Sequence, residues 1–303
     1  MPTPRPSRAS PVSGTGFNLT GAPPDPALLI GTGPYTPAAI DPGHTTLEAN
    51  PNYRGDNAPT YERVVLRHIG DPPEAVAALA DGSVDVVARQ TTVDVAQALN
   101  AINGITVESG FDATHERLDL QVANGRNDRF DDPLVRRAFL TTFPRQQIVD
   151  ELAAPVHADA RVRSSHVFLP GTDGYTDAAE SNGSAVNNRP DLAGAKRLLR
   201  QAGVVAPEVC ILFDPADPRR LNEFELIQSA AAKAGFQVTD CSSPTWQELL
   251  GVPGQYDASL YALRASDLAV TAARASFAST GGVNNTSFYS QRRGRCPPLG
   301  ARS

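Results

Sequence analysis

Polar side chains that follow a predicted strand near residue 260 are the best candidates for ligand binding in this sequence. The run Tyr256–Leu263 is typical of a strand, and Arg264, Ser266 and Asp267 come directly after it. In open α/β sheets, ligands lie beyond the carboxyl ends of the strands. A guanidinium, a hydroxyl and a carboxylate there would bind the polar groups of a small solute. We therefore predict that these three residues contact a ligand, with a loop or capping role as the alternative for Asp267.

Trp246 is the only tryptophan of the chain and follows Pro244. Its ring has two roles that the sequence leaves open: stacking on a ligand, or packing at the start of a helix.

The motifs that usually indicate catalysis are absent from the sequence. Gly31-Thr-Gly33 lacks the third glycine of a phosphate-binding loop, no GxSxG occurs, and the five histidines show no metal-binding spacing. The pair Asp131-Asp132 stands at a predicted helix start, where capping explains it. The sequence therefore predicts no enzyme, no metal site and no cofactor.

Three cysteines remain, and none of them belongs to a CxxC motif. Cys210 and Cys241 lie in predicted regular structure, whereas Cys296 lies in a basic terminal stretch. The first two would form a disulfide in an extracytoplasmic protein, or would stay separate buried thiols.

Composition favours a folded chain with more than one lobe. The 303 residues are 41% hydrophobic and 20% charged, and a chain of this length exceeds the usual size of one hydrophobic core. No apolar run approaches the roughly 18 residues of a membrane span. The net charge is −6, and six of the 27 basic residues lie in the first eight and last thirteen positions. The body is therefore strongly acidic, which disfavours nucleic-acid binding.

Short strands alternate with helices along most of the sequence, so the predicted class is α/β with mixed sheets. The clearest unit is a strand at 209–213, a helix that starts at Asp217-Pro218 and ends at Gly235, and a strand at 236–240. Such a crossover predicts two parallel strands. Other strands are expected at 46–50, 61–69, 84–87, 104–108, 115–123 and 256–263, and other helices at 74–80, 92–100, 133–141, 144–152 and 190–201.

Several short motifs occur in an order that resembles a known family. They are Gly31-Thr-Gly-Pro-Tyr35, Asn50-Pro-Asn-Tyr-Arg-Gly55, Gly82-Ser-Val-Asp85, Phe130-Asp-Asp-Pro-Leu-Val-Arg-Arg-Ala138, Asp191 with Ala195-Lys-Arg-Leu-Leu199, and Asn284-Asn285 before Tyr289-Ser290. The chain is similar over about residues 29–290 to the solute-binding proteins of the peptide/nickel class (family five) that serve ABC importers. The resemblance implies class II periplasmic-binding-protein-like lobes with mixed sheets around a cleft.

The resemblance also implies partners and site residues. The ligand would be an oligopeptide or another small solute, and ABC permease subunits would be the protein partner, in an extracytoplasmic location. Members often bind a peptide's terminal amine with an acidic residue, to which Asp267 is the nearest match. Asn124 lies where the chain would leave the first lobe, which makes it a candidate cleft residue.

Family members are about twice as long as this chain, so we expect a truncated copy that need not be functional. No export signal is recognisable at the start of the sequence. The back-translated stretch from Gln291 regains family-like residues when read one base later, so 291–303 is expected to be a frameshifted tail, with a native basic terminus as the alternative. The expected parts are an irregular segment 1–28, a partial, incomplete first lobe 29–125, a truncated second lobe 126–290 and that tail. A ligand-sensing domain of a transcriptional regulator is the alternative function.

Overall fold

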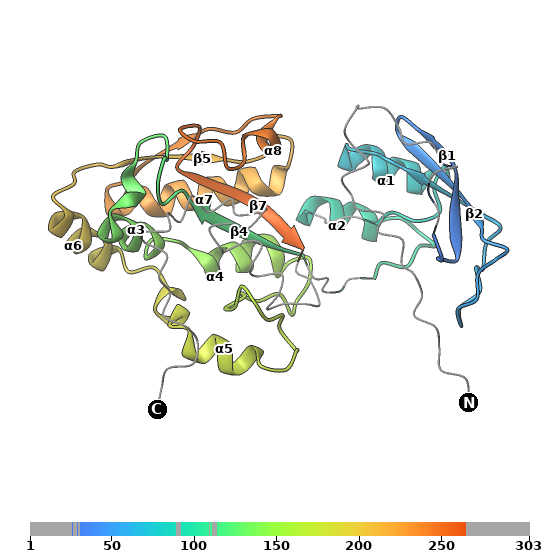
Figure 1. Ribbon diagram of the computed structural model, residues 1–303, viewed down its shortest axis with the longest axis horizontal. Helices are drawn as coiled ribbons and strands as arrows, with labels where there is room; N and C mark the ends of the chain where they lie inside the picture. Colours follow the sequence, from blue (N-terminus) through green and yellow to red (C-terminus); the bar gives the residue numbers. More distant parts are fainter. Residues whose placement is uncertain are drawn as a thin grey trace. The chain divides into compact units, whose positions relative to one another are not determined.

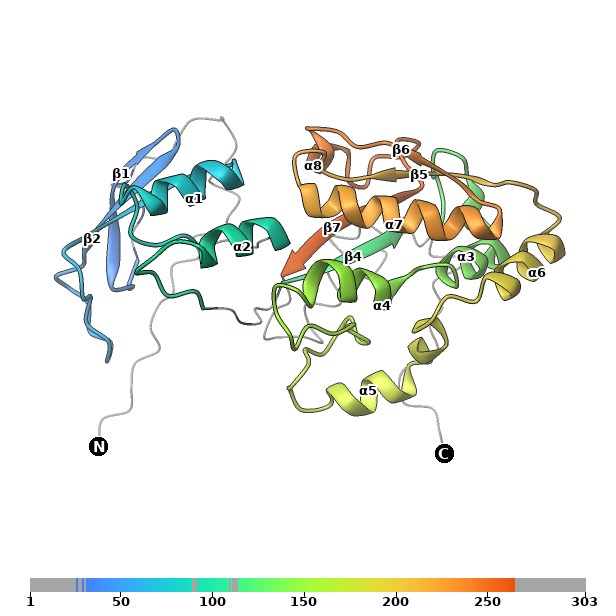
Figure 2. The same cartoon turned by 180° about the vertical axis from the view of Figure 1, so that it is seen from behind.

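The computed structural model describes residues 31–88, 92–108 and 114–264, together with Pro26, Leu29 and Gly110. The chain divides into two compact units, Met1–Arg89 and Gln90–Ser303. Each unit is described by itself (Figures 1 and 2).

The first unit contains a three-stranded antiparallel sheet in the order β1-β2-β3, with bounds Tyr35–Asp41, His44–Ala49 and Arg63–Arg67. Gly43, with φ +94°, makes the tight turn between β1 and β2. Asn50 follows β2 and closes the Gly31–Tyr35 segment against it. Its Nδ2 donates to the carbonyl of Gly33 at 2.8 Å, and its backbone N–H donates to Pro34 at 2.8 Å. The segment that contains Gly31 and Gly33 is therefore held against β2 by hydrogen bonds, and Gly33 supplies one of the acceptors.

Two short helices have the boundaries that their capping residues predict. In α1 (Pro72–Ala80), the side chain of Asp71 accepts a hydrogen bond from the backbone N–H of Glu74, and a proline occupies the first turn. In α2 (Val93–Asn100), Thr92 is the N-cap residue, and Val95 and Leu99 form the buried stripe.

The second unit is built on a four-stranded mixed sheet in the order β4-β7-β5-β6. The strands are β4 (Thr114–Leu120), β5 (Glu208–Leu212), β6 (Gln237–Asp240) and β7 (Ala258–Arg264). β5 runs parallel to both β6 and β7, and β4 runs antiparallel to β7. The predicted crossover is therefore confirmed.

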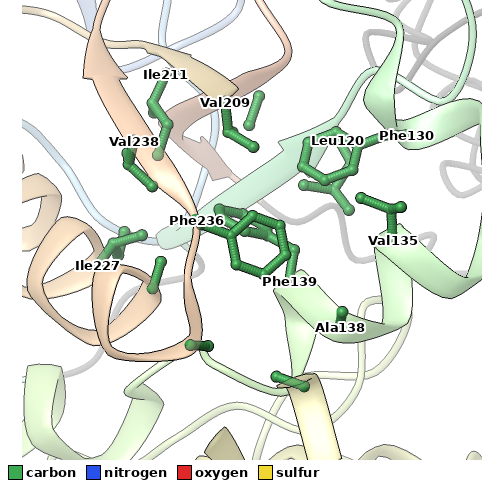
Figure 3. Close-up of a cluster of buried hydrophobic side chains, with 14 of the residues drawn as sticks. Leu120, Phe130, Val135, Ala138, Phe139, Val209, Ile211, Ile227, Phe236 and Val238 are labelled. Carbon is green, nitrogen blue, oxygen red and sulfur yellow. The ribbon is translucent and has the colours of Figure 1, made fainter. Parts of the chain in front are cut away.

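Helix α7 (Pro218–Ala234) connects β5 to β6 and lies along the sheet (Figure 2). Asp217 caps its start by accepting from the N–H groups of Arg219 and Arg220, and Gly235 ends it at φ +101°. One core of eighteen buried residues joins the sheet to α7 and to the helices at 133–140 and 192–202. Phe139 is at its centre, with its ring centroid 5.2 Å from those of Phe130 and Phe236 (Figure 3). This core makes the sheet and its helices one folding unit.

Further helices complete the second unit. α3 (Pro133–Leu140) begins at Asp132, whose side chain accepts from the N–H of Leu134, and α6 (Leu192–Ala202) begins at Asp191 and ends at Gly203. α4 (Arg145–Ile148) continues into a π-helical segment, η4 (Val149–Ala153). Residues 155–188, for which the sequence predicts neither strand nor helix, carry α5 (Tyr175–Ser181). α8 is the single turn Trp246–Leu249. Of the described helices, none has the length and apolarity needed to cross a membrane.

Two of the predicted strands are wrong. Residues 84–87 and 104–108 are described, but neither is in a sheet. Val86 is 78% exposed and Val107 is 44% exposed, so these apolar side chains do not pack on a core as strand residues would. A short apolar run forms a strand only if a neighbouring strand pairs with its backbone N–H and C=O groups.

The structure settles the state of two cysteines. Cys210 in β5 and Cys241 after β6 form a disulfide with a Cα–Cα distance of 5.6 Å. The alternative of two separate buried thiols is therefore wrong. In the parallel register of β5 and β6, Cys210 lies opposite Thr239, and Cys241 follows two residues later, within reach of its sulfur.

The predicted lobe boundary at residue 125 does not coincide with the division between the compact units. β4 pairs with β7 along its whole length, from Thr114 opposite Arg264 to Leu120 opposite Ala258. Residues 114–120 therefore belong by their contacts to the second unit. The boundary at 125 is predicted for lobes on either side of a cleft, which is a different division from that into compact units. It therefore stays a prediction.

Candidate functional site

A network of charged side chains lies at the carboxyl edge of β5 in the second unit. β7 begins level with the end of β5, at Ile211 opposite Ala258, and then extends beyond it. The start of α7 thus lies beside the second half of β7 and the first half of β4. This is the edge at which open α/β sheets bind ligands.

An ion-pair network joins α7 to β4 at this edge. The guanidinium of Arg219 is 2.5 Å from Oε1 of Glu116, and that of Arg220 lies 3.6 Å from Oε2 of the same carboxylate. Asp217 contacts both arginines, at 3.6 and 3.5 Å. Burial alone would lower the pKa of Arg219, but Glu116, Glu223 and Asp217 outweigh burial and raise it. These two arginines are therefore neutralised within the network.

Glu223 lies one turn further along α7 and is 4% exposed. Its Oε2 has no hydrogen-bond partner among the described residues. Burial, followed by the nearby charge of Glu116, raises the pKa of this carboxyl from 4.5 to about 8. Two arginines already balance Glu116 and Asp217, so Glu223 keeps its proton at neutral pH.

A cavity of about 740 Å³ opens beside this network, entirely within the second unit. One wall is apolar and comes mainly from α4, η4 and the sheet: Leu118, Phe143, Ile148, Val149, Leu152 and Leu260. The charged side chains of the lining are Glu116, Arg117, Arg145, Arg161, Arg163, Arg219 and Glu223. Its volume lies in the range of small-molecule sites.

Two of the lining arginines bind carbonyl oxygens instead of carboxylates. Arg145 donates from Nη2 to the carbonyl of Arg163 at 2.7 Å, and Arg163 donates from Nε to that of Ser165 at 2.6 Å. Nη1 of Arg163 also lies 2.6 Å from Nδ1 of His115. Burial lowers the pKa of both arginines. The arginines nonetheless stay charged, because a guanidinium does not lose its proton in proteins.

A buried polar group lies on the strands themselves. Nε of Arg117 donates to Asp119 at 2.9 Å, and the hydroxyl of Tyr261 donates to Oδ2 of Asp119 at 2.6 Å. The Trp246 ring is 6.2 Å from that of Tyr261, and the guanidinium of Arg220 lies 5.0 Å from the Trp246 ring centre. Trp246 thus packs at the start of α8, and packing at a helix start is one of the two roles that the sequence leaves open for it.

The predicted site residues are not all brought together. Arg264 ends β7, and Ser266 and Asp267 lie outside the described residues. Asn124 follows β4 at the opposite end of the sheet, where its carbonyl accepts from Gly254 at 2.8 Å and its φ is +58°. The seven residues of β7 span about 20 Å, and Asn124 and Arg264 lie at opposite ends of that length. The two side chains therefore cannot contact the same small group of a ligand.

The cavity residues on α4, α7 and the 160–163 loop were missed by the sequence reasoning. One signal was available: Glu116, Arg117 and Asp119 interrupt a run that otherwise reads as a strand. Charged residues inside a strand whose other side chains are apolar indicate buried pairs. Nothing in the sequence placed Arg145 or Arg163 beside them, because the loop from 155 to 170 has no periodic pattern. Within the described residues, no group of three or more His, Cys, Asp or Glu side chains could hold a metal ion.

Comparison with known proteins gives one family and a set of similar folds. Residues 6–285 match the family model described as bacterial extracellular solute-binding proteins, family 5 Middle. A search of the curated proteins finds no match.

Among solved structures, the periplasmic EDTA-binding protein EppA is 22% identical with a TM-score of 0.71, over 84% of this chain and 50% of EppA. NikA from Staphylococcus aureus, in complex with Ni(L-His)2, is 16% identical with a TM-score of 0.62, over 85% of this chain and 53% of NikA. DppA from Helicobacter pylori, in complex with the peptide STSA, is 22% identical with a TM-score of 0.62, over 79% of this chain and 44% of DppA. The chain therefore shares their fold and spans about half of their length.

Proposed function

Because this chain belongs to the bacterial extracellular solute-binding proteins of family 5, we propose that it captures a small solute for an ABC importer. Proteins of this family are binding components and not enzymes. The observation that carries the proposal is the cavity of about 740 Å³ at the carboxyl edge of the sheet, lined by an apolar wall and five arginines.

Peptides and metal complexes are the solute classes that we propose to test first. The similar structures named above are those of proteins that bind EDTA, a nickel–histidine complex and a peptide. The predicted contacts Arg264, Ser266 and Asp267 belong to this proposal, as do the permease subunits and an extracytoplasmic location. The Cys210–Cys241 disulfide supports that location, since disulfides persist in oxidising compartments. A regulator's sensing domain has no observation in its favour.

The test is a thermal-shift and calorimetric screen of the 303-residue chain against tetrapeptides, Ni(L-His)2 and metal–EDTA complexes. A ligand present at a hundred times its Kd stabilises the folded state by about 2.7 kcal/mol, which raises the midpoint by several degrees. We expect at least one class to bind without being consumed. Absence of binding by every class, or chemical turnover of a bound ligand, would contradict the proposal.

A further inference from the structure

We propose that the cavity of the second unit binds an organic carboxylate that has an apolar body and a second hydrogen-bond acceptor, with Arg145 pairing with the carboxylate and Glu223 donating to the acceptor. An acylated amino acid or the carboxyl end of a short peptide has this chemistry. The inference rests on the proposed function and narrows it, because it names the chemical class of the solute and the residues that select it.

The charge of the cavity selects an anion. Arg219 and Arg117 are paired with Glu116 and Asp119, but no acidic side chain among the described residues forms an ion pair with Arg145 or Arg163. The contacts of Arg145 are a carbonyl at 2.7 Å and the side chain of Asn188 at 3.5 Å. These use two of the five N–H groups of its guanidinium, which leaves donors for a carboxylate.

Arg163 supplies the second charge but has a structural task as well. It donates to the carbonyls of Ser165 and Phe168 and so holds the loop that closes one side of the cavity. Arg145 in turn donates to the carbonyl of Arg163. The two guanidiniums therefore lie in one connected group, and Arg145 is the one whose remaining donors a ligand can use.

Glu223 supplies a neutral donor on the α7 side of the same cavity. Its side chain is almost fully buried, and its Oε2 has no hydrogen-bond partner among the described residues. The charged groups that face it are Glu116 from β4 and Asp217, Arg219 and Arg220 from the start of α7. With its proton in place, Glu223 donates to a ligand oxygen and does not repel an anion. The apolar wall from α4 and η4 then packs against the body of the ligand.

This arrangement predicts that binding weakens at high pH. The pKa of Glu223 is raised to about 8, so the carboxyl is mostly protonated at pH 7 and mostly ionised at pH 9. If only the protonated form accepts the anion, the apparent affinity falls about tenfold between these pH values. A ligand carboxylate does not titrate in this range.

The experiment is calorimetric or NMR titration of the full chain with N-acetyl-L-phenylalanine. Its uncharged amide, N-acetyl-L-phenylalaninamide, is the ligand control.

The Arg145→Gln variant should bind the acid at least about tenfold more weakly. Arg145→Lys should restore part of the affinity, which shows that the fold is intact. Arg137→Gln, which removes an exposed charge from α3 away from the cavity, should bind like the wild type. Glu223→Gln keeps a donor at every pH, so it should bind at pH 7 and lose the pH dependence.

Three results would overturn the inference: equal binding of the acid and the amide, unchanged binding by Arg145→Gln, or the same pH dependence in Glu223→Gln as in the wild type. If the acid does not bind while a nickel or EDTA complex from the first screen does, this inference fails and the proposed function stands. If nothing in either experiment binds, both fail.

Discussion

At the scale of single residues, Asp257 holds together three segments of the second unit. It is 1% exposed and precedes β7. Its carboxylate accepts from the N–H of Cys210 at 2.9 Å, from the N–H of Asn127 at 2.7 Å and from the side-chain amide of Asn127 at 2.8 Å. The neighbouring Gly125 leaves room for it, since a Cβ at that position would lie 2.9 Å from Oδ1. One carboxylate thus fixes the exit from β4 against β5.

We expect Asp257→Ala to lower the free energy of unfolding of the second unit by about 2–4 kcal/mol. The substitution leaves two backbone N–H groups without their acceptor, and one of them, on Cys210, is fully buried. Asp240→Ala is the matched control, because that carboxylate is exposed and accepts one hydrogen bond from the next turn. Urea denaturation followed by circular dichroism measures both. Equal midpoints for the two variants would show that Asp257 is not such a link.

Residues that act on their immediate neighbours were predictable, whereas residues that act across the fold were not. Asp71, Asp132 and Asp217 each stand before a proline that opens a helix, and each caps that helix. Asp257 and Glu223 carry no such local pattern. Their roles depend on β5 and β4, which lie far away in the sequence and reach them only through the order of strands in the sheet.

At the scale of elements, the disulfide adds a covalent link to a crossover that hydrogen bonds already define. The backbone N–H of Cys241 donates to Ile211 at 3.0 Å, so β5 and β6 are paired next to the bond. The strands and helix of this crossover were predictable because they are adjacent in the sequence and end at Asp217 and Gly235. The two false strands, at 84–87 and 104–108, have apolar runs of the same kind, but no neighbouring strand pairs with them.

The double variant Cys210→Ala with Cys241→Ala should lose about 3–4 kcal/mol of stability. The bond closes a loop with a sequence separation of 31, and its removal restores that loop's freedom to the unfolded chain. The measurement is urea unfolding with and without dithiothreitol. Reductant should destabilise the wild type by a similar amount and leave the double variant unchanged. An effect of reductant on the double variant would assign the loss to something other than this bond.

At the scale of the whole molecule, the two units differ in how much core they possess. In the described part of the first unit, the buried hydrophobic residues are Ala75 and Ala78, and Val65 and Leu66 on the edge strand β3 are about half exposed. A three-stranded sheet with so little burial is only marginally stable. The second unit has eighteen buried residues in one cluster and a covalent crosslink. The proposed cavity therefore lies in the unit that is better able to hold its shape.

Limited proteolysis should separate these two units. Because cleavage follows local opening, we expect proteinase K to cut first within residues 31–88 and to leave a fragment that contains residues 114–264. The pairing of β4 with β7 sets the start of this fragment at or before Thr114, since a cut within β4 would break the hydrogen bonds that β4 makes to β7 along its whole length. Mass spectrometry of the fragments identifies the boundaries.

N-acetyl-L-phenylalanine should slow cleavage of the 114–264 fragment and leave the cutting of residues 31–88 unchanged. Cleavage of both units at one rate, together with a single cooperative unfolding transition, would show that the first unit is as stable as the second.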